Sequence, residues 1–79
     1  MMVRAKFTVR EITRTKHWDK SKGEIQTIVL SPVSDGSDEN RRFFEASPTG
    51  EIKLGTVNEA AARQFELGKA YYVDFTPAE

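Results

Sequence analysis

The side chains able to do chemistry in this chain are few, and they do not form a known catalytic pattern. His17 is the only histidine and cysteine is absent, which removes thiolate nucleophiles and any pair of His or Cys metal ligands. The five glycines form neither a Walker phosphate loop nor a dinucleotide-binding pattern. Carboxylates are plentiful, but no spacing singles out a catalytic pair. We therefore predict a protein that is not an enzyme and that uses no cofactor and no metal.

Three acidic residues lie close together in the sequence and could form a cation site. Asp35, Asp38 and Glu39 fall in the polar segment 34–40, where three carboxylates could hold a hard cation. Their spacing does not match the alternating ligands and the position-12 glutamate of a calcium loop. We interpret the cluster as part of a solvated loop.

Basic and aromatic side chains gather in the first third of the chain, around Trp18. Single-stranded nucleic acid is bound by cations along its backbone and by aromatic rings stacked on its bases, and each stack contributes about 1–3 kcal/mol. We expect the first three cations on the exposed face of a strand and the next ones at its end and in a turn. The candidate nucleic-acid-binding residues are Arg4, Lys6, Arg10, Arg14, Lys16, Trp18, Lys20, Arg41 and Arg42.

Other interpretations of this set stay open. Trp18 could cover the open end of a barrel, and cations on a strand face often serve only as solvated surface or as protection for a sheet edge. The first 30 residues carry seven basic and three acidic groups, while residues 31–79 carry five and nine. The net charge is therefore zero and the pI is near 6.6, whereas a dedicated nucleic-acid-binding domain usually has a pI above about 9.

A bent first strand positions most of these cations. Apolar and polar residues alternate over 3–9, which predicts a strand with one buried face and one basic face. The next large apolar residue, Ile12, follows Val9 by three positions instead of two. We therefore predict a β-bulge near Arg10 and Glu11 that returns Ile12 to the core.

The rest of the chain indicates four more strands and one helix. Asn58 is a good N-cap, the alanines after it favour a helix, and Gly68 is a typical residue to end it. In the last strand, Tyr71, Val73 and Phe75 share one face. The predicted elements are a turn over 19–23, strands over 25–33, 41–46, 52–56 and 70–76, a loop over 34–40, a turn over 47–50, and a helix of about two turns that packs Ala61, Phe65 and Leu67 on the sheet.

This order, β-β-β-β-α-β, predicts one mainly β domain over residues 1–79. Five short strands and one helical turn are typical of a small antiparallel barrel or half-barrel. The helical turn before the last strand slightly favours an SH3-like barrel over an OB-like one. A sheet with one helix packed on it is the third alternative.

Four stretches carry a resemblance to known proteins: VRAKF at 3–7, SPTGEIKL at 47–54, the helix at 58–65 and YYVDFTP at 71–77. In these stretches, and over most of its length outside 16–23 and 34–40, the chain resembles small proteins of tailed bacteriophages. These proteins are largely uncharacterised, so the resemblance implies a phage setting and no catalytic residues. It favours binding to nucleic acid or to a host protein.

Two functions from different classes follow as hypotheses. The first is a phage accessory protein that binds single-stranded DNA or RNA through the basic and aromatic set. The alternative is a protein-binding inhibitor or adaptor that acts on a host or phage enzyme, through the acidic loop 35–39, the C-terminal carboxylates or an added edge strand. Self-assembly through an exposed edge strand is a third option.

The location of the protein is predicted from what the sequence does not contain. The N-terminus alternates charged and apolar residues, so it has no apolar signal-peptide stretch. No run approaches the roughly 20 apolar residues that cross a membrane. We therefore expect a protein of the cytoplasm of the infected bacterial host with no membrane partner.

Overall fold

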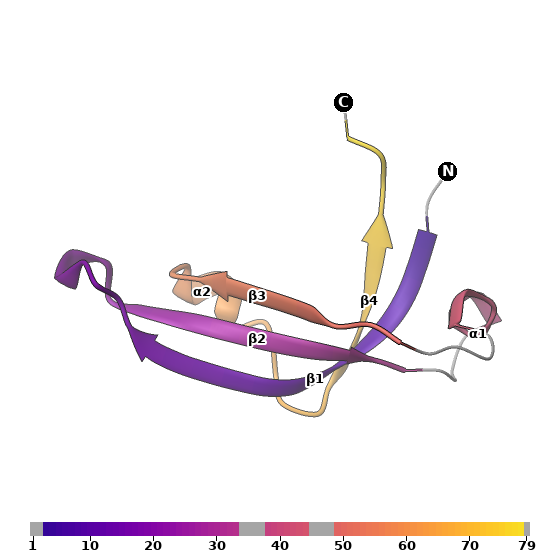
Figure 1. The fold of residues 1–79 in the computed structure, drawn as a ribbon, viewed down its shortest axis with the longest axis horizontal. Helices are drawn as coiled ribbons and strands as arrows, with labels where there is room; N and C mark the ends of the chain where they lie inside the picture. Colours follow the sequence, from indigo (N-terminus) through magenta and orange to yellow (C-terminus); the bar gives the residue numbers. More distant parts are fainter. Residues whose placement is uncertain (1–2, 34–37, 45–48, 79) are drawn as a thin grey trace.

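Four antiparallel strands form one open sheet, which confirms the predicted mainly β class. The computed structural model describes residues 3–33, 38–44 and 49–78. The strands lie in the order β3-β2-β1-β4, and short helical segments connect them (Figure 1). The elements are β1 (Val3–Lys16), η1 (Lys20–Lys22), β2 (Glu24–Pro32), α1 (Asp38–Phe44), β3 (Ile52–Thr56), α2 (Glu59–Ala62) and β4 (Ala70–Phe75).

The first strand is long and bends, because it pairs with two different strands. Residues 3–8 of β1 pair with β4, and residues 7–16 pair with β2. The register between β1 and β2 shifts between Val9 and Glu11, which confirms the predicted β-bulge. Because the bulge adds one residue, Ile12 returns to the face of the sheet that holds Val9.

The segment predicted as a third strand is helical where the structure describes it, so the prediction of a strand over 41–46 is wrong. Asp38 lies at the start of α1, and Arg41 and Arg42 lie in its last turn, which is the favourable order of charges along a helix dipole. Arg41 also forms an ion pair with Asp38, one helical turn away. These local interactions outweigh the strand propensity of the phenylalanines.

The sheet does not close into a barrel. In the part of the chain that the structure describes, β3 pairs only with β2 and β4 pairs only with β1, so both are edge strands. The prediction was a five-stranded barrel or half-barrel, SH3-like or OB-like. A closed barrel is therefore wrong, and the described sheet has four strands because α1 stands where the third strand was predicted. The parts of the predicted loop, strand and turn at 34–37 and 45–48 lie outside the described residues.

The helix before the last strand begins where the sequence predicts but ends sooner. The Asn58 side chain accepts a hydrogen bond from the Ala61 N–H (3.1 Å), which confirms it as the N-cap. α2 is only one turn long, and the predicted helix end at Gly68 is wrong. Gly68 has a φ of 83°, and its N–H donates to the carbonyl of Val9 (2.9 Å), so it turns the chain into β4.

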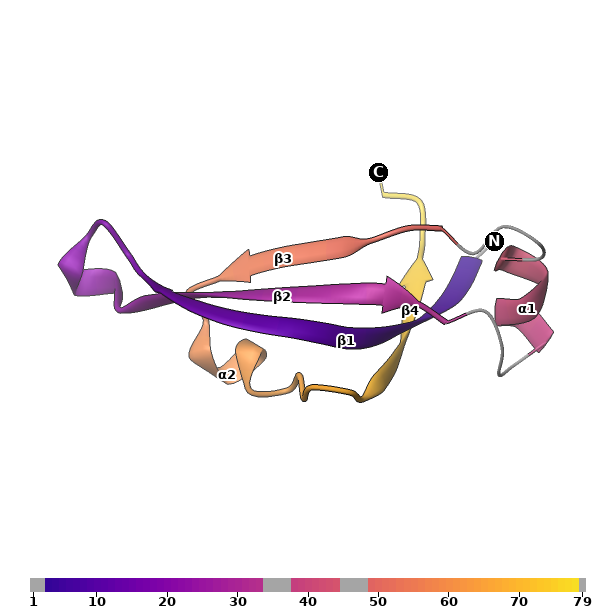
Figure 2. The same cartoon turned by 60° about the horizontal axis from the view of Figure 1, so that its bottom comes forward.

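The core is small and lies on one face of the sheet, which α2 and the segment after it partly cover (Figure 2). Phe65 packs against this core as predicted, and Ala62 is the buried residue of α2. Ala61 and Leu67 are exposed, contrary to the prediction: Ala61 lies within α2 but not on its buried side, and Leu67 lies beyond the end of the helix. The buried cluster consists of Ala5, Phe7, Val9, Ile28, Leu30 and Ala62.

Candidate functional site

The β1–β2 hairpin projects from one end of the sheet (Figure 1), and we call residues 16–23 the hairpin tip. The His17 N–H donates to the carbonyl of Gly23 (3.2 Å), and the Lys22 N–H donates to that of Asp19 (3.0 Å). Gly23 has a φ of 77°, a conformation that favours glycine. These contacts confirm the predicted turn and give the tip a fixed backbone.

Trp18 stands at this tip with 85% of its surface exposed. Its ring stacks on His17, with a centroid distance of 3.8 Å and an interplanar angle of 28°. The Asp19 N–H donates to Nδ1 of His17 (2.8 Å), which holds the imidazole in place and requires Nδ1 to be unprotonated. Trp18 therefore does not cover a barrel end, and it presents its ring to solvent from a supported position.

A shallow groove of about 440 Å³ runs beside the Trp18 ring, and we call it the tip groove. A Cβ atom placed on Gly55 would lie 3.8 Å from Cγ2 of Ile25, so the missing side chain leaves the surface of β3 open there. This groove was not predicted from the sequence, although a glycine inside an alternating strand is a known signal of close approach by another group. The lining residues are His17, Trp18, Ile25, Gly55, Thr56 and Val57.

Three lysines surround the tip, namely Lys16, Lys20 and Lys22, and all are exposed. Within the described residues none of the three takes part in an ion pair. Of the acidic groups nearby, Asp19 accepts hydrogen bonds from the hydroxyl and the N–H of Ser21, which lower its pKa. The carboxylate caps η1 in this way, and the lysines keep their charges available to a ligand.

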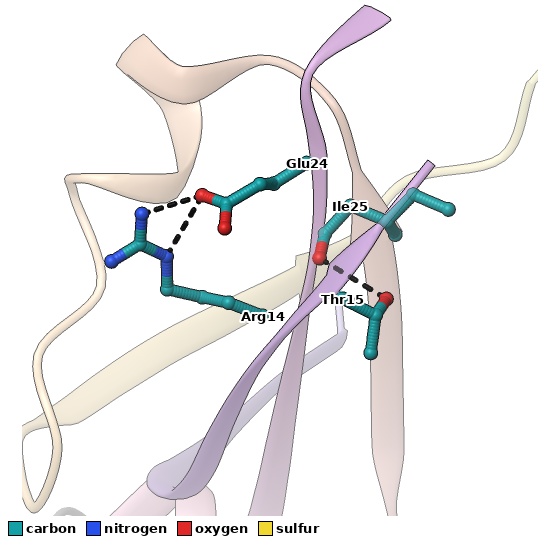
Figure 3. A network of polar contacts seen from close by, with 4 residues as sticks. All are labelled: Arg14, Thr15, Glu24 and Ile25. Carbon is teal, nitrogen blue, oxygen red and sulfur yellow. Dashed lines mark hydrogen bonds and ion pairs between the residues drawn. The ribbon is translucent and has the colours of Figure 1, made fainter. Parts of the chain in front are cut away.

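Arg14 is a predicted binding residue that the structure uses to hold the hairpin. Its Nε and Nη2 donate to the same oxygen of Glu24 at 3.1 and 2.5 Å, so the pair ties β1 to β2 at the base of the tip (Figure 3). The hydrogen bond and charge of Glu24 raise the pKa of Arg14. Next to this pair, the Thr15 hydroxyl donates a long hydrogen bond to the carbonyl of Ile25 (3.5 Å).

Two further predicted cations are also neutralised by carboxylates. Arg4 donates from Nε and Nη2 to the two oxygens of Asp74 (2.7 and 3.2 Å), and its guanidinium lies 5.1 Å from the centroid of the Tyr72 ring. The hydrogen bond from Arg4 lowers the pKa of Asp74. Arg10 donates to Glu51 (2.6 Å). These arginines are therefore less available to a phosphate than the sequence alone indicates.

The nine predicted residues do not form one surface. The bulge places Arg14 and Lys16 in phase with Ile12, on the α2 face, whereas Arg4 and Lys6 lie on the opposite face of β1. Arg4, Lys6 and the α1 residues Arg41 and Arg42 lie at the end of the molecule away from the tip (Figure 1), and the longest dimension is 45 Å. Arg14, Lys16, Trp18 and Lys20 share the hairpin end of the molecule, but Arg14 and Lys16 lie on the α2 face whereas Ile25 and Gly55 of the tip groove lie on the other face.

A second, larger groove of about 580 Å³ lies on the core face between β3 and β4, and we call it the inner groove. The predicted common face of Tyr71, Val73 and Phe75 is confirmed, because these residues pair with the core-facing residues of β1. This face was expected to lie inside a barrel, whereas Phe75 is 51% exposed. The main lining residues are Leu30, Ile52, Leu54, Tyr71, Val73 and Phe75.

The described ranges contain neither a cluster of metal ligands nor a membrane-spanning helix. No three His, Asp or Glu side chains in 3–33, 38–44 and 49–78 gather closely enough to hold a metal ion. No helix in these ranges has the length and apolar character needed to cross a membrane. Comparison with models of protein families, with curated proteins and with solved structures finds no match to this chain. Its function is therefore inferred from its own residues.

Proposed function

We propose that this chain is a non-catalytic protein that binds single-stranded nucleic acid at the hairpin tip. The observation that carries this proposal is Trp18, an indole that is 85% exposed and supported by His17. Burial of a large aromatic side chain usually stabilises the fold, and the exposed Trp18 ring contributes little in this way. A ring held open to solvent is suited to stack on a base, and because every base has a flat face, such stacking tolerates any sequence.

The lysines around the ring supply the second part of such a site. Lys16, Lys20 and Lys22 are exposed and close to Trp18 in the sequence, and their positive charges can attract the backbone of a strand whose base lies on the ring. The tip groove offers apolar surface over Gly55 and Ile25 for the edge of that base or for its neighbour. The proposed site is therefore smaller than the predicted set and does not include Arg4, Lys6, Arg10, Arg41 or Arg42.

The charge of the whole chain limits how tightly this site holds its ligand. The net charge is zero, so the chain as a whole has no net attraction for a polyanion that would add to the local charge of the tip. We expect binding that depends on the tip alone and weakens as salt concentration rises. We add to this proposal the phage setting expected from the sequence, in which single-stranded nucleic acid is exposed inside an infected bacterial cell.

The decisive variant is Trp18→Ala, measured by fluorescence anisotropy with labelled single-stranded DNA and RNA. We expect the affinity to fall by about 1–3 kcal/mol, or roughly 5- to 150-fold, because one base stack is lost. The matched control is Phe43→Ala, which removes an exposed aromatic ring on α1 at the other end of the molecule. Equal affinities of wild type and Trp18→Ala, or equal losses in the two variants, would contradict the proposal.

A second variant tests the tip groove without removing the indole. In Gly55→Leu the new Cβ meets Ile25 and Thr27 at ordinary contact distances of 3.8 and 3.9 Å, so β3 accommodates it and the rest of the side chain fills the groove. We expect weaker binding with an unchanged far-UV circular dichroism spectrum. Unchanged affinity would restrict the site to Trp18 and the lysines.

A protein partner is the second candidate function, and the apolar inner groove favours it. The acidic surface predicted for such a partner has less support, because Asp38 is paired with Arg41 and residues 34–37 lie outside the described ranges. No binding of nucleic acid at low salt, together with capture of one protein that Phe75→Lys abolishes, would favour this candidate.

A further inference from the structure

We propose that two copies of this chain form a symmetric dimer by antiparallel pairing of their β4 strands, with Val73 of each copy opposite Val73 of the other. This dimer does not depend on the nucleic-acid site, because β4 and the hairpin tip lie apart (Figure 1). The observations that support it are a poorly protected strand edge, an open apolar groove beside that edge, and an excess of exposed surface.

The outer edge of β4 carries few of the features that prevent strands from associating. Natural edge strands are protected by lysines, prolines, bulges or very short lengths. β4 has six residues, no lysine, no proline and no bulge in its register with β1. Its one charged side chain, Asp74, is neutralised by Arg4 within the same copy. The other edge strand, β3, carries Lys53 near its centre, so β4 is the edge left open to a partner.

The inner groove lies where a strand added to β4 would extend. The bend of β1 sets the β1–β4 pair at an angle to the β2–β3 pair, so the unpaired edges of β4 and β3 face the inside of this bend (Figure 1). The groove between them is lined by Ile52 and Leu54 from β3 and by alternate residues of β4. Apolar side chains of an added strand would fill this space.

The β4 side chains are complementary to their own antiparallel copy. Residues directly opposite each other in paired strands share one face of the sheet. Centred on Val73, the pairing sets Phe75 opposite Tyr71 of the second copy on the groove face, and Tyr72 opposite Asp74 of the second copy on the other face. The Tyr71 ring is already fixed, because its hydroxyl donates to the carbonyl of Gln64 (2.7 Å) and accepts from the N–H of Glu66 (3.0 Å).

The exposed surface of the chain is large enough for such a dimer. Its accessible surface is 5953 Å², whereas a compact monomer of 9.0 kDa exposes about 4,900 Å². The excess, about 1,000 Å², belongs to the whole chain, including the projecting hairpin, and it is larger than the roughly 800 Å² that each partner buries in a standard interface. A two-fold axis makes this interface isologous and closed, so pairing stops at two copies and does not continue into fibres.

The test combines a mass measurement with a cross-linking measurement. Light scattering after size exclusion should give wild type twice the 9.0 kDa mass of one chain, and Phe75→Lys should give a single chain, because the ammonium would enter the groove face of the interface. Phe75 is half exposed at the end of β4, so this variant should keep its fold. The matched control Leu67→Lys changes an exposed leucine outside β4 and should leave the dimer intact.

A disulfide cross-link between two copies tests the register of the paired β4 strands. It does not require that the Phe75→Lys variant folds. The chain has no cysteine, so Val73→Cys introduces the only thiol. Directly opposite residues of an antiparallel pair have Cα atoms about 4.5 or 5.5 Å apart, within the range of a disulfide. Mild oxidation should therefore link Val73→Cys into dimers and leave Leu67→Cys as single chains. A wild-type monomer at all concentrations, a dimer that survives Phe75→Lys, or no selective Val73→Cys cross-link would overturn the proposal.

Discussion

Replacing Lys16, Lys20 and Lys22 together with alanine removes three exposed positive charges from the hairpin tip. In the described chain none of these lysines is in an ion pair, so their loss leaves no carboxylate without its partner. The fold should therefore remain stable, since exposed substitutions of this kind usually change the free energy of unfolding by no more than about 0.5 kcal/mol each. The expected effect is on binding and on its dependence on salt.

The size of this effect follows from the number of lysines. Each phosphate contact with a single strand contributes about 0.7 to the slope of log affinity against log salt concentration, so three contacts contribute about 2. Wild type should then lose roughly 20-fold in affinity between 50 and 200 mM salt, and the triple variant should lose almost none. Anisotropy titrations with labelled single-stranded DNA over this salt range measure both slopes.

The control must remove the same charge from elsewhere, because a lower net charge alone weakens attraction to a polyanion. Arg42, Arg63 and Lys69 are exposed cations outside the hairpin tip, and their replacement by alanine gives the same net charge, although Lys69, unlike the tip lysines, is paired with a carboxylate, that of Glu66 (3.2 Å). This control should keep the steep wild-type slope. Equal slopes in the two triple variants, or an unchanged slope in the tip variant, would refute the assignment of phosphate contacts to the tip.

Two further predictions concern stability, measured as the urea midpoint. Asn58→Ala removes the acceptor of the Ala61 N–H and should lower the free energy of unfolding by about 1 kcal/mol, and Asn58→Asp should restore most of it. The hydrogen bond from Arg4 lowers the pKa of Asp74 in the folded state below its ordinary value of 3.8. The pair therefore stabilises the fold fully at pH values above 3.8, and this contribution disappears as the pH falls through the lower pKa of the folded state. The stability difference between wild type and Asp74→Asn should therefore shrink from neutral pH to below 3.8, and a constant difference would show that the pair contributes nothing.

The parts of the fold that the sequence predicts correctly are those with strong local patterns. Alternation over 3–9 and the three-residue step from Val9 to Ile12 together predict a bulged strand, and the register confirms it. Asn58 followed by alanines likewise predicts the start of α2. Each of these signals is contained within a few residues, so tertiary contacts do not have to be known to interpret it.

The wrong predictions of the fold come from short segments whose residues are compatible with more than one secondary structure. The phenylalanines of 41–46 favour a strand, whereas Asp38 and the arginines one turn later favour a helix, and nothing in the sequence alone decides between them. The barrel prediction failed with it, because closing the sheet required that strand. The length of α2 was overestimated because Gly68, which is a common helix end, instead serves the turn before β4.

The candidate site could be predicted only in part, because much of it depends on contacts between distant residues. Arg4 and Asp74 are 70 positions apart, so their ion pair cannot be inferred from spacing. The bulge also reverses the faces of Arg14 and Lys16 relative to Arg4, which an unbroken alternation would have placed together. Trp18 was predicted as a candidate, but its exposure depends on the hairpin projecting beyond the sheet.

The most direct test of the proposed function follows the emission of Trp18 during titration with unlabelled single-stranded DNA and RNA at low salt. Trp18 is the only tryptophan, so any change in indole emission reports on the hairpin tip. We predict saturable quenching that is reversed by added salt, because a base stacks on the ring while the lysines hold the backbone. Emission that stays constant at saturating nucleic acid would contradict the account, because Trp18 would then not contact the ligand.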